Sequence, residues 1–281
     1  MEVKVKNKSG KTIWKLLFYL LLFFLVLCTI FPFLWMLSTS FKYDTQVFTN
    51  PIQWIPNPIK PDNYQIVWTQ IPFALFLKNT AIVAVVGTFL QIVCCSTAAY
   101  AFAKMDFKGK NILFVLYMAT MMIPWHTIMI PQHMLMGRIG MHDKLAVLIL
   151  MQAFGAFGIF LLRQFFMGVP DELREAAQID GAGEVRIFFC IMLQQAKPGL
   201  ATLVIFTFIT QWNDYITPLI YLNSPENYTL QLGLKMFATQ YTMQYGLTMA
   251  GTLCSMVPLF IVYLVFEKQI TKGIAFTGMK G

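Results

Sequence analysis

The run LLFYLLLFFLVLCTIFPFLWML, residues 16–37, contains no charged side chain. A bilayer core requires about 20 apolar residues in a helix, and about 17 to 25 are tolerated. The run is therefore long enough to cross a membrane as one helix. Its apolar residues are continuous and do not alternate with polar ones, which excludes a strand of a membrane β-barrel.

Five further runs along the chain have a similar length and composition. Helices satisfy their own backbone hydrogen bonds in lipid, so each run is expected to be helical. The sequence therefore predicts an all-α integral membrane protein with six transmembrane helices in a domain over residues 16–266. The five further spans are expected at residues 80–103, 112–130, 145–162, 200–222 and 249–266.

The composition supports this class and excludes others. Hydrophobic residues make up 57% of the 281 residues and charged residues 12%, whereas a soluble domain carries about a quarter charged residues. A chain with 26 Phe is too apolar for a disordered protein. The 5 Cys form no disulfide framework and the 3 His have no metal-like spacing. No metal site is therefore expected.

The basic residues predict the orientation of the spans. Of the 21 Lys and Arg, fifteen fall on the side that holds both termini and six on the other. Cytoplasmic segments carry the excess of Lys and Arg, so residues 1–15 and the tail 267–281 are expected in the cytoplasm. The net charge of +8 then requires no nucleic-acid partner. The first run is expected to be a retained helix, because no small-residue cleavage site follows it.

The segment 163–198, between the fourth and fifth expected spans, is unusually rich in acids. Pro170 suits the first position of a helix, and acids after it suit the positive end of the helix dipole. Gly181 and Gly183 break that helix, and a second helical stretch is expected over 185–195. The segment is predicted to be either a docking element for a soluble partner or a solvated amphipathic connector. Its acids are Asp171, Glu172, Glu175, Asp180 and Glu184.

The spacing within this segment resembles a known motif. Glu175-Ala176-Ala177, followed by Gly181, Ile191 and Leu193, is similar to the EAA loop of ABC importer permeases, and we call residues 163–198 the EAA loop. The family usually has Pro after that Leu, where this chain has Gln194. Other stretches are similar to the carbohydrate-uptake branch of the family: Trp54-Ile55-Pro56, residues 98–104, Trp212-Asn213-Asp214 and Gly278-Met279-Lys280-Gly281.

The resemblance implies a type I ABC importer permease fold in a bacterial cell membrane and half of a sugar translocation path. It implies a second homologous permease, two ATPase subunits docked on the EAA loops, and an extracellular sugar-binding protein facing residues 223–246. It assigns ATPase coupling to Glu175, Ala176, Ala177, Asp180 and Gly181. It assigns a C-terminal ATPase contact to Gly278, Lys280 and Gly281.

No phosphate-binding loop of the G-x-x-x-x-G-K-[ST] type is present. We therefore expect no catalytic residue and no cofactor in this chain, with ATP and Mg²⁺ bound by the partner subunits. A membrane enzyme is a poorer interpretation, because the sequence offers no nucleophile–base pair or metal cluster.

Asp214 is the only acid inside an apolar run, and an ionisable residue in a membrane is a functional candidate by default. The cluster Gln211, Trp212, Asn213, Asp214 and Tyr215 is a candidate lining of the translocation path, since sugars bind polar groups and aromatic faces. The alternative is that Asp214 pairs with another helix, or with the second permease, and fixes packing. The alternative function is an ion-coupled secondary transporter or channel, with Asp214 as its proton or cation site.

Overall fold

The computed structural model describes residues 8–238 and 243–278, with side chains over 14–238 and 243–268. The described residues form helices and no strand, apart from one isolated bridge between Ala238 and Met243. The prediction of an all-α chain is confirmed.

The chain divides into two compact units. Unit 1 comprises residues 1–70 and 237–254, and unit 2 comprises residues 71–236 and 255–281. The long helix α14 (Tyr245–Gly278) contributes its first turns to unit 1 and the remainder to unit 2.

Unit 1 contains α1 (Lys8–Ser40), the short η1 (Asp44–Gln46) and α2 (Asp62–Gln70). The apolar side chains of α1 are exposed from Trp14 to Leu34, as expected of a helix that faces lipid. Beyond α1, the side-chain amide of Asn63 donates hydrogen bonds to the carbonyls of Ser40 (2.9 Å) and Lys42 (3.0 Å). These bonds fix the start of α2 against the end of α1.

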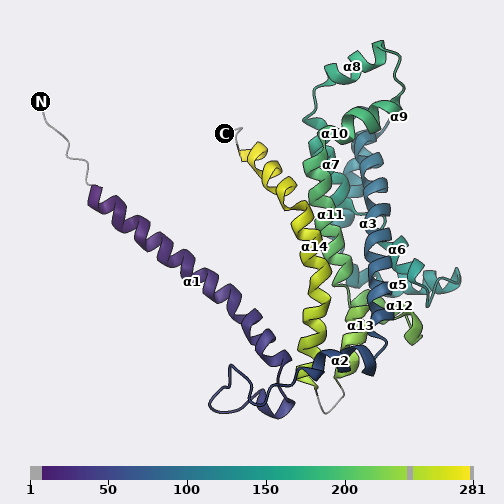
Figure 1. Ribbon diagram of the computed structural model, residues 1–281. Coiled ribbons are helices and arrows are strands. Elements are labelled where there is room, and N and C mark those ends of the chain that lie inside the picture. Colours follow the sequence, from purple (N-terminus) through teal and green to yellow (C-terminus); the bar gives the residue numbers. More distant parts are fainter. Residues whose placement is uncertain (1–7, 239–242, 279–281) are drawn as a thin grey trace, which may run out of the picture. The chain divides into compact units, whose positions relative to one another are not determined.

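Unit 2 is built around α3 (Phe73–Lys104), which packs against α7 (Ala156–Met167) and α11 (Lys197–Trp212). Figure 1 shows these three helices side by side, with α8 and α9 at one end of the unit and α12 and α13 at the other. The other helical elements of unit 2 are α4 (Lys110–Ala119), η2 (Thr120–Met122), α5 (Trp125–Arg138), α6 (Leu145–Met151), α8 (Asp171–Ile179), α9 (Glu184–Ile187), the π-helical η3 (Phe188–Met192), α10 (Leu193–Gln195), α12 (Ile216–Tyr221), η4 (Pro225–Asn227), α13 (Leu230–Leu234) and η5 (Lys235–Phe237). The last residue of η5, Phe237, belongs to unit 1.

Small residues allow these helices to approach closely. A Cβ at Gly158 would lie 2.8 Å from Sγ of Cys95, so α7 can meet α3 there only without a side chain. Gly199 on α11 faces the ring of Phe165 in the same way. Close approach through Gly is typical of helix packing in membranes, where no hydrophobic effect drives helices together.

The structure offers three helices that could cross a membrane singly, and up to six candidate spans when bent helix pairs are included. Three helices are long and apolar enough to cross a membrane: Trp14–Ser40, Phe73–Lys104 and Tyr245–Lys268. Three further helix pairs pass the same test together: Lys110–Met122 with Trp125–Arg138, Leu145–Met151 with Ala156–Met167, and Glu184–Gln195 with Lys197–Trp212. The described residues thus provide up to six spans, if each bent pair crosses once.

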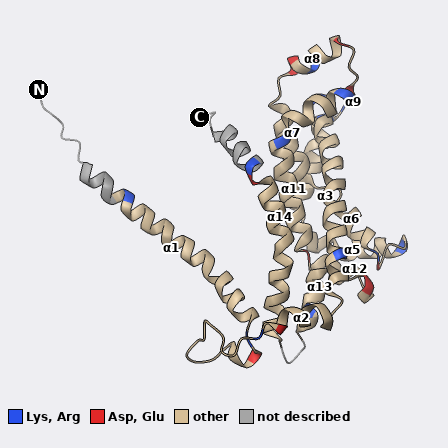
Figure 2. Ribbon diagram, viewed as in Figure 1, with Lys and Arg blue, Asp and Glu red and all other residues tan. Residues whose placement is uncertain are grey.

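Three of the expected spans are broken. The third bends by 101° at Pro124, where proline removes a backbone donor. The fourth bends by 45° before α7, whose N-cap is Gly155. The fifth, expected as one helix over 200–222, separates into α11 and α12 at Asn213–Tyr215. Figure 2 shows that the Lys, Arg, Asp and Glu of unit 2 gather largely at its two ends.

Candidate functional site

The EAA loop carries the helix–turn–helix that the sequence predicts. Pro170 stands at the N-cap of α8, one position earlier than expected, and Asp171 and Glu172 occupy the first turn. Acids at this end favour a helix because its N-terminus carries partial positive charge. The helix ends at Ile179, and Gly181 adopts a φ of +80°. Because side chains disfavour that backbone conformation, glycine is suited to the turn.

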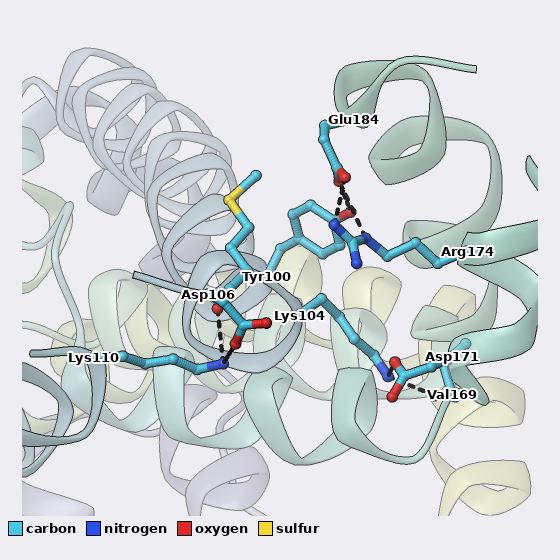
Figure 3. Close-up of polar contacts among 9 residues, drawn as sticks. Tyr100, Lys104, Asp106, Lys110, Val169, Asp171, Arg174 and Glu184 are labelled. Carbon is cyan, nitrogen blue, oxygen red and sulfur yellow. Dashed lines mark hydrogen bonds and ion pairs between the residues drawn. The ribbon is translucent and has the colours of Figure 1, made fainter. Parts of the chain in front are cut away.

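Glu184, the first residue of α9, joins three helices (Figure 3). Its Oε1 accepts hydrogen bonds from Nη2 of Arg174 at 2.5 Å and Nε2 of Gln178 at 2.8 Å, both on α8. Its Oε2 accepts a hydrogen bond from the hydroxyl of Tyr100 on α3 at 2.5 Å. We call Tyr100, Arg174, Gln178 and Glu184 the Glu184 cluster. The cluster ties α8 and α9 to the side of α3.

Partial burial strengthens this cluster. The side chains of Arg174 and Glu184 are 26% and 33% exposed, so water screens their attraction only in part. The hydrogen bond that the Arg174 guanidinium donates to Glu184 raises the pKa of the guanidinium, which therefore stays charged. Charge-assisted hydrogen bonds of this kind are about twice as strong as neutral ones.

A second contact fixes the start of α8 to the end of α3. Nζ of Lys104, the last residue of α3, donates to the carbonyl of Val169 at 2.7 Å and to Oδ1 of Asp171 at 2.5 Å (Figure 3). The Lys104 side chain is only 5% exposed, whereas that of Asp171 is 71% exposed. The hydrogen bond and charge of Lys104 lower the pKa of the Asp171 carboxyl. Two polar contacts therefore attach α8 to α3.

The opposite surface of α8 and its turn is free for a partner. Glu175, Ala176, Asp180 and Gly181 are exposed, while Ala177 packs partly against the core. Within the described part of the chain, neither Glu175 nor Asp180 forms an ion pair. The structure thus brings the five predicted coupling residues together on α8 and the turn after it.

Apolar side chains surround these residues. Ile179 is 86% exposed and Val185 is 72% exposed, on either side of the turn. Between α8 and the helices that follow lies a groove of about 220 Å³, lined by Ala177, Asp180, Ala182, Arg186, Ile187, Cys190 and Ile191. An exposed apolar surface with a groove and unpaired acids has the character of a protein-docking surface.

The sharp turn of the EAA loop lies two residues after Gln194. The helical segment from Glu184 to Gln195 meets α11 at an angle of 79°, with Ala196 between them. Pro198 follows in the first turn of α11, where a proline needs no intrahelical donor. Gln194 itself remains helical, so the bend does not require a proline at that position.

A cavity of about 900 Å³ opens within unit 2, and we call it the polar cavity. This volume lies in the range of small-molecule sites. Its polar lining comprises Gln91, His126, Gln132, Gln152, Thr207, Thr210, Asn213, Asp214 and Thr217. Its aromatic lining comprises Trp125, Phe154, Phe157, Phe206 and Tyr215. Aromatic faces next to amide and hydroxyl groups suit a polyhydroxylated ligand.

The five predicted path residues divide between this cavity and the helix packing. Asn213, Asp214 and Tyr215 line the cavity. Gln211 is 3% exposed and packs against Gly87, while Trp212 is 2% exposed and its indole N–H donates to the carbonyl of Ser255 at 3.0 Å. The break in the helix after Trp212 therefore separates lining residues from packing residues.

Asp214 is held by two donors from different elements. Oδ2 accepts a hydrogen bond from Nε2 of Gln152 at 3.2 Å, and Oδ1 accepts one from the backbone N–H of Thr217 at 3.1 Å. Thr217 lies in the first turn of α12, where a carboxylate is a favoured capping group. The break between α11 and α12 is thus stabilised by the same residue that lines the cavity.

Some organising residues were not predicted from the sequence. Tyr100 and Lys104 hold the EAA loop, yet both lie in or beside an apolar run far from it in sequence. Asp143, with a φ of +55°, accepts hydrogen bonds from the backbone N–H groups of Asn223 (2.9 Å) and Ser224 (3.0 Å) and from the Ser224 hydroxyl. These donors lower the pKa of the Asp143 carboxyl. Its positive φ is visible only in the structure, so the sequence gives no indication that Asp143 organises this loop.

Most of the predicted C-terminal ATPase contact lies outside the described residues. Gly278 is the last residue of α14, and Lys280 and Gly281 fall outside the described residues.

Comparison with known proteins gives consistent results. Residues 91–274 match the family described as binding-protein-dependent transport system inner membrane component. The chain is 32% identical to the arabinooligosaccharides transport system permease protein AraQ of Halalkalibacterium halodurans, over 92% of this chain and 94% of that protein. It is 30% identical to the lactose transport system permease protein LacG of Rhizobium radiobacter, over 88% of this chain and 89% of that protein.

A solved structure has the same fold. It is a chain of a bacterial ABC transporter involved in the import of the acidic polysaccharide alginate. The TM-score is 0.83 at 25% sequence identity, covering 95% of this chain and 99% of that chain. The prediction of an importer permease fold is confirmed by this match and by the family.

Proposed function

Because this chain belongs to the family of binding-protein-dependent transport system inner membrane components, we propose that it forms half of the translocation path of an ATP-driven sugar importer. It is a permease component and not an ATPase, since ATP hydrolysis in such transporters belongs to separate subunits. Two ATPase subunits, a second homologous permease and an extracellular sugar-binding protein complete the assembly. Both termini and the EAA loop face the cytoplasm, where Lys and Arg are most abundant.

One observation carries the coupling part of this proposal: the EAA loop is bound to α3 on one side and free on the other. Glu175 and Asp180 supply unpaired acids for an ATPase surface, and Ile179 and Val185 supply apolar area. The Glu184 cluster and the Lys104 contact then transmit any displacement of α8 to α3. Coupling of two sites needs such a connected element with more than one arrangement.

The helix α3 connects this loop with the polar cavity. Tyr100 belongs to the Glu184 cluster, and Gln91 lines the cavity nine residues earlier on the same helix. At 1.5 Å per residue the two positions lie about 14 Å apart along the helix axis. When ATP binding draws the two EAA loops together, α3 moves with them, and the cavity opens toward one side of the membrane and then the other. This is alternating access.

Sugar as the cargo is supported by the cavity and by the relatives. The relatives named above are permeases for arabinooligosaccharides and for lactose. The lining of amide, hydroxyl and aromatic side chains in the polar cavity suits the same ligand class. An ion-coupled transporter would instead need its own driving site, whereas Asp214 here also caps α12.

The proposal is tested by reversing one charge on the free surface of α8. In the reconstituted complex, Glu175→Lys should reduce ATP-dependent saccharide uptake at least tenfold while the complex still inserts in the membrane. Asp106→Lys is the matched control, because Asp106 is an exposed acid outside the EAA loop, just after α3. Wild-type uptake in Glu175→Lys, or equal loss in both variants, would contradict the coupling role.

A further inference from the structure

We propose that the polar cavity selects neutral saccharides over anionic ones, and that Asp214 sets this selectivity. This inference rests on the proposed function, because it assumes that a saccharide occupies the cavity during transport. It names the substrate class from the charges that line the site.

The charge of Asp214 is not cancelled by its partners. The two groups that donate to it, the Gln152 amide and the Thr217 N–H, are uncharged. Among the described residues that line the cavity, Asp214 is the one carboxylate, and there is no Lys or Arg. His126 lines the same cavity, and Lys235 lies outside the lining with its ammonium 5.4 Å from the centre of the Tyr215 ring. The cavity therefore presents a fixed negative charge to a ligand.

Asp214 also retains the capacity to bind a ligand. A carboxylate has about four acceptor positions, of which two are used here. A saccharide hydroxyl can donate to the others, whereas a saccharide carboxylate can only be repelled. A cavity within a membrane protein has a low effective dielectric constant, which strengthens that repulsion relative to water.

The aromatic lining provides the second half of the recognition. Nε1 of Trp125 donates to Oε1 of Gln132 at 3.1 Å, which fixes the orientation of the indole ring at the cavity wall. A fixed indole face offers a surface for the C–H face of a sugar ring, and this contact does not depend on the ligand's charge. Asp214 then distinguishes between ligands that stack equally well.

The solved relative with the same fold handles a different kind of cargo from the neutral saccharides proposed here. That transporter is involved in the import of an acidic polysaccharide. The fold itself therefore does not exclude an anionic cargo, so the selection that we propose rests on side chains and not on the fold. In this chain the acid at the break between α11 and α12 is the side chain placed to do so.

The experiment uses the complete complex of two permeases and two ATPases in nanodiscs, without the binding protein, so that the membrane subunits alone determine selectivity. Maltotriose and trigalacturonate, a neutral and an anionic trisaccharide, are titrated at low ionic strength. We expect the wild type to bind maltotriose at least tenfold more tightly. Asp214→Asn should reduce the ratio of maltotriose affinity to trigalacturonate affinity below threefold by improving trigalacturonate binding. Asn keeps the cap of α12 and removes the charge.

Glu226→Gln is the matched control, since it removes an exposed acid of unit 2 that does not line the cavity. It should leave the ratio of the maltotriose and trigalacturonate affinities unchanged. Added salt should lower that ratio in the wild type, because it screens the repulsion between Asp214 and the anionic ligand. A wild type that binds both probes equally, or neither, overturns the inference, as does a ratio unaltered in Asp214→Asn. ATP-dependent saccharide uptake is measured separately, in proteoliposomes that hold the same complex together with its sugar-binding protein. If uptake is present while the ratio fails, the proposed function stands; if uptake is absent, both fail.

Discussion

The Glu184 cluster and the polar cavity use their carboxylates differently. Glu184 accepts four hydrogen bonds from three side chains on two helices, two of them from the charged Arg174. Asp214 accepts one from a side chain and one from the backbone, both uncharged. A saturated carboxylate holds helices in one relative position. A partly saturated carboxylate keeps acceptor positions for a ligand, so the first arrangement suits transmission of motion and the second suits binding.

The largest effect is expected from removing the saturated carboxylate. Glu184→Ala leaves Tyr100 and Arg174 without their acceptor and removes one of the two polar contacts that attach α8 to α3. Hydrogen bonds to charged groups contribute about 1.5–3 kcal/mol each, and about 1.4 kcal/mol corresponds to a tenfold change. We expect saccharide uptake by the reconstituted complex to fall at least tenfold while its ATPase activity persists.

Glu184→Gln separates coupling from folding in this test. The amide retains an acceptor oxygen for Arg174 or Tyr100 but loses the charge, so uptake should lie between the wild type and Glu184→Ala. Copurification of the ATPase subunits reports whether each variant still assembles. If Glu184→Ala assembles and transports at the wild-type rate, the cluster does not transmit motion.

A smaller effect is expected from the cavity wall. Trp125→Ala removes the indole face, and aromatic contacts contribute about 0.5–1.5 kcal/mol beyond the area they bury. Maltotriose binding to the complex should weaken between about twofold and tenfold. Trp125→Phe keeps a ring but loses the hydrogen bond to Gln132, so it should lose less affinity. Equal affinity in Trp125→Ala and the wild type would exclude stacking on this residue.

The sequence predicts the parts of this comparison that depend on local pattern. Apolar runs give the spans, and the acids after Pro170 with Gly181 give α8 and its turn, because caps and glycine act within a few residues. The clusters depend on contacts over long separations: Tyr100 meets Glu184 across 84 positions. Hydropathy also does not report where a span breaks. From the sequence, Gln211 and Trp212 are therefore candidates for the path lining on the same footing as Asp214. The helix end places Asp214 in the cavity and leaves Gln211 and Trp212 buried in the helix packing.

The smallest effect is expected at the second contact of the EAA loop, and it depends on pH. Lys104 lowers the pKa of the Asp171 carboxyl below its ordinary value of 3.8. A carboxyl with a depressed folded-state pKa contributes stability that is present above the ordinary value and lost as the pH falls through the lowered value.

Lys104→Met removes the charge but preserves the apolar stem, and at neutral pH uptake should fall by no more than about twofold because Asp171 is largely solvated. The melting temperature of the purified chain should be lower in Lys104→Met than in the wild type at pH 5, and the difference should shrink as the pH is lowered toward 2.5. A difference that stays constant over this range would show that Lys104 acts through its bond to the Val169 carbonyl alone.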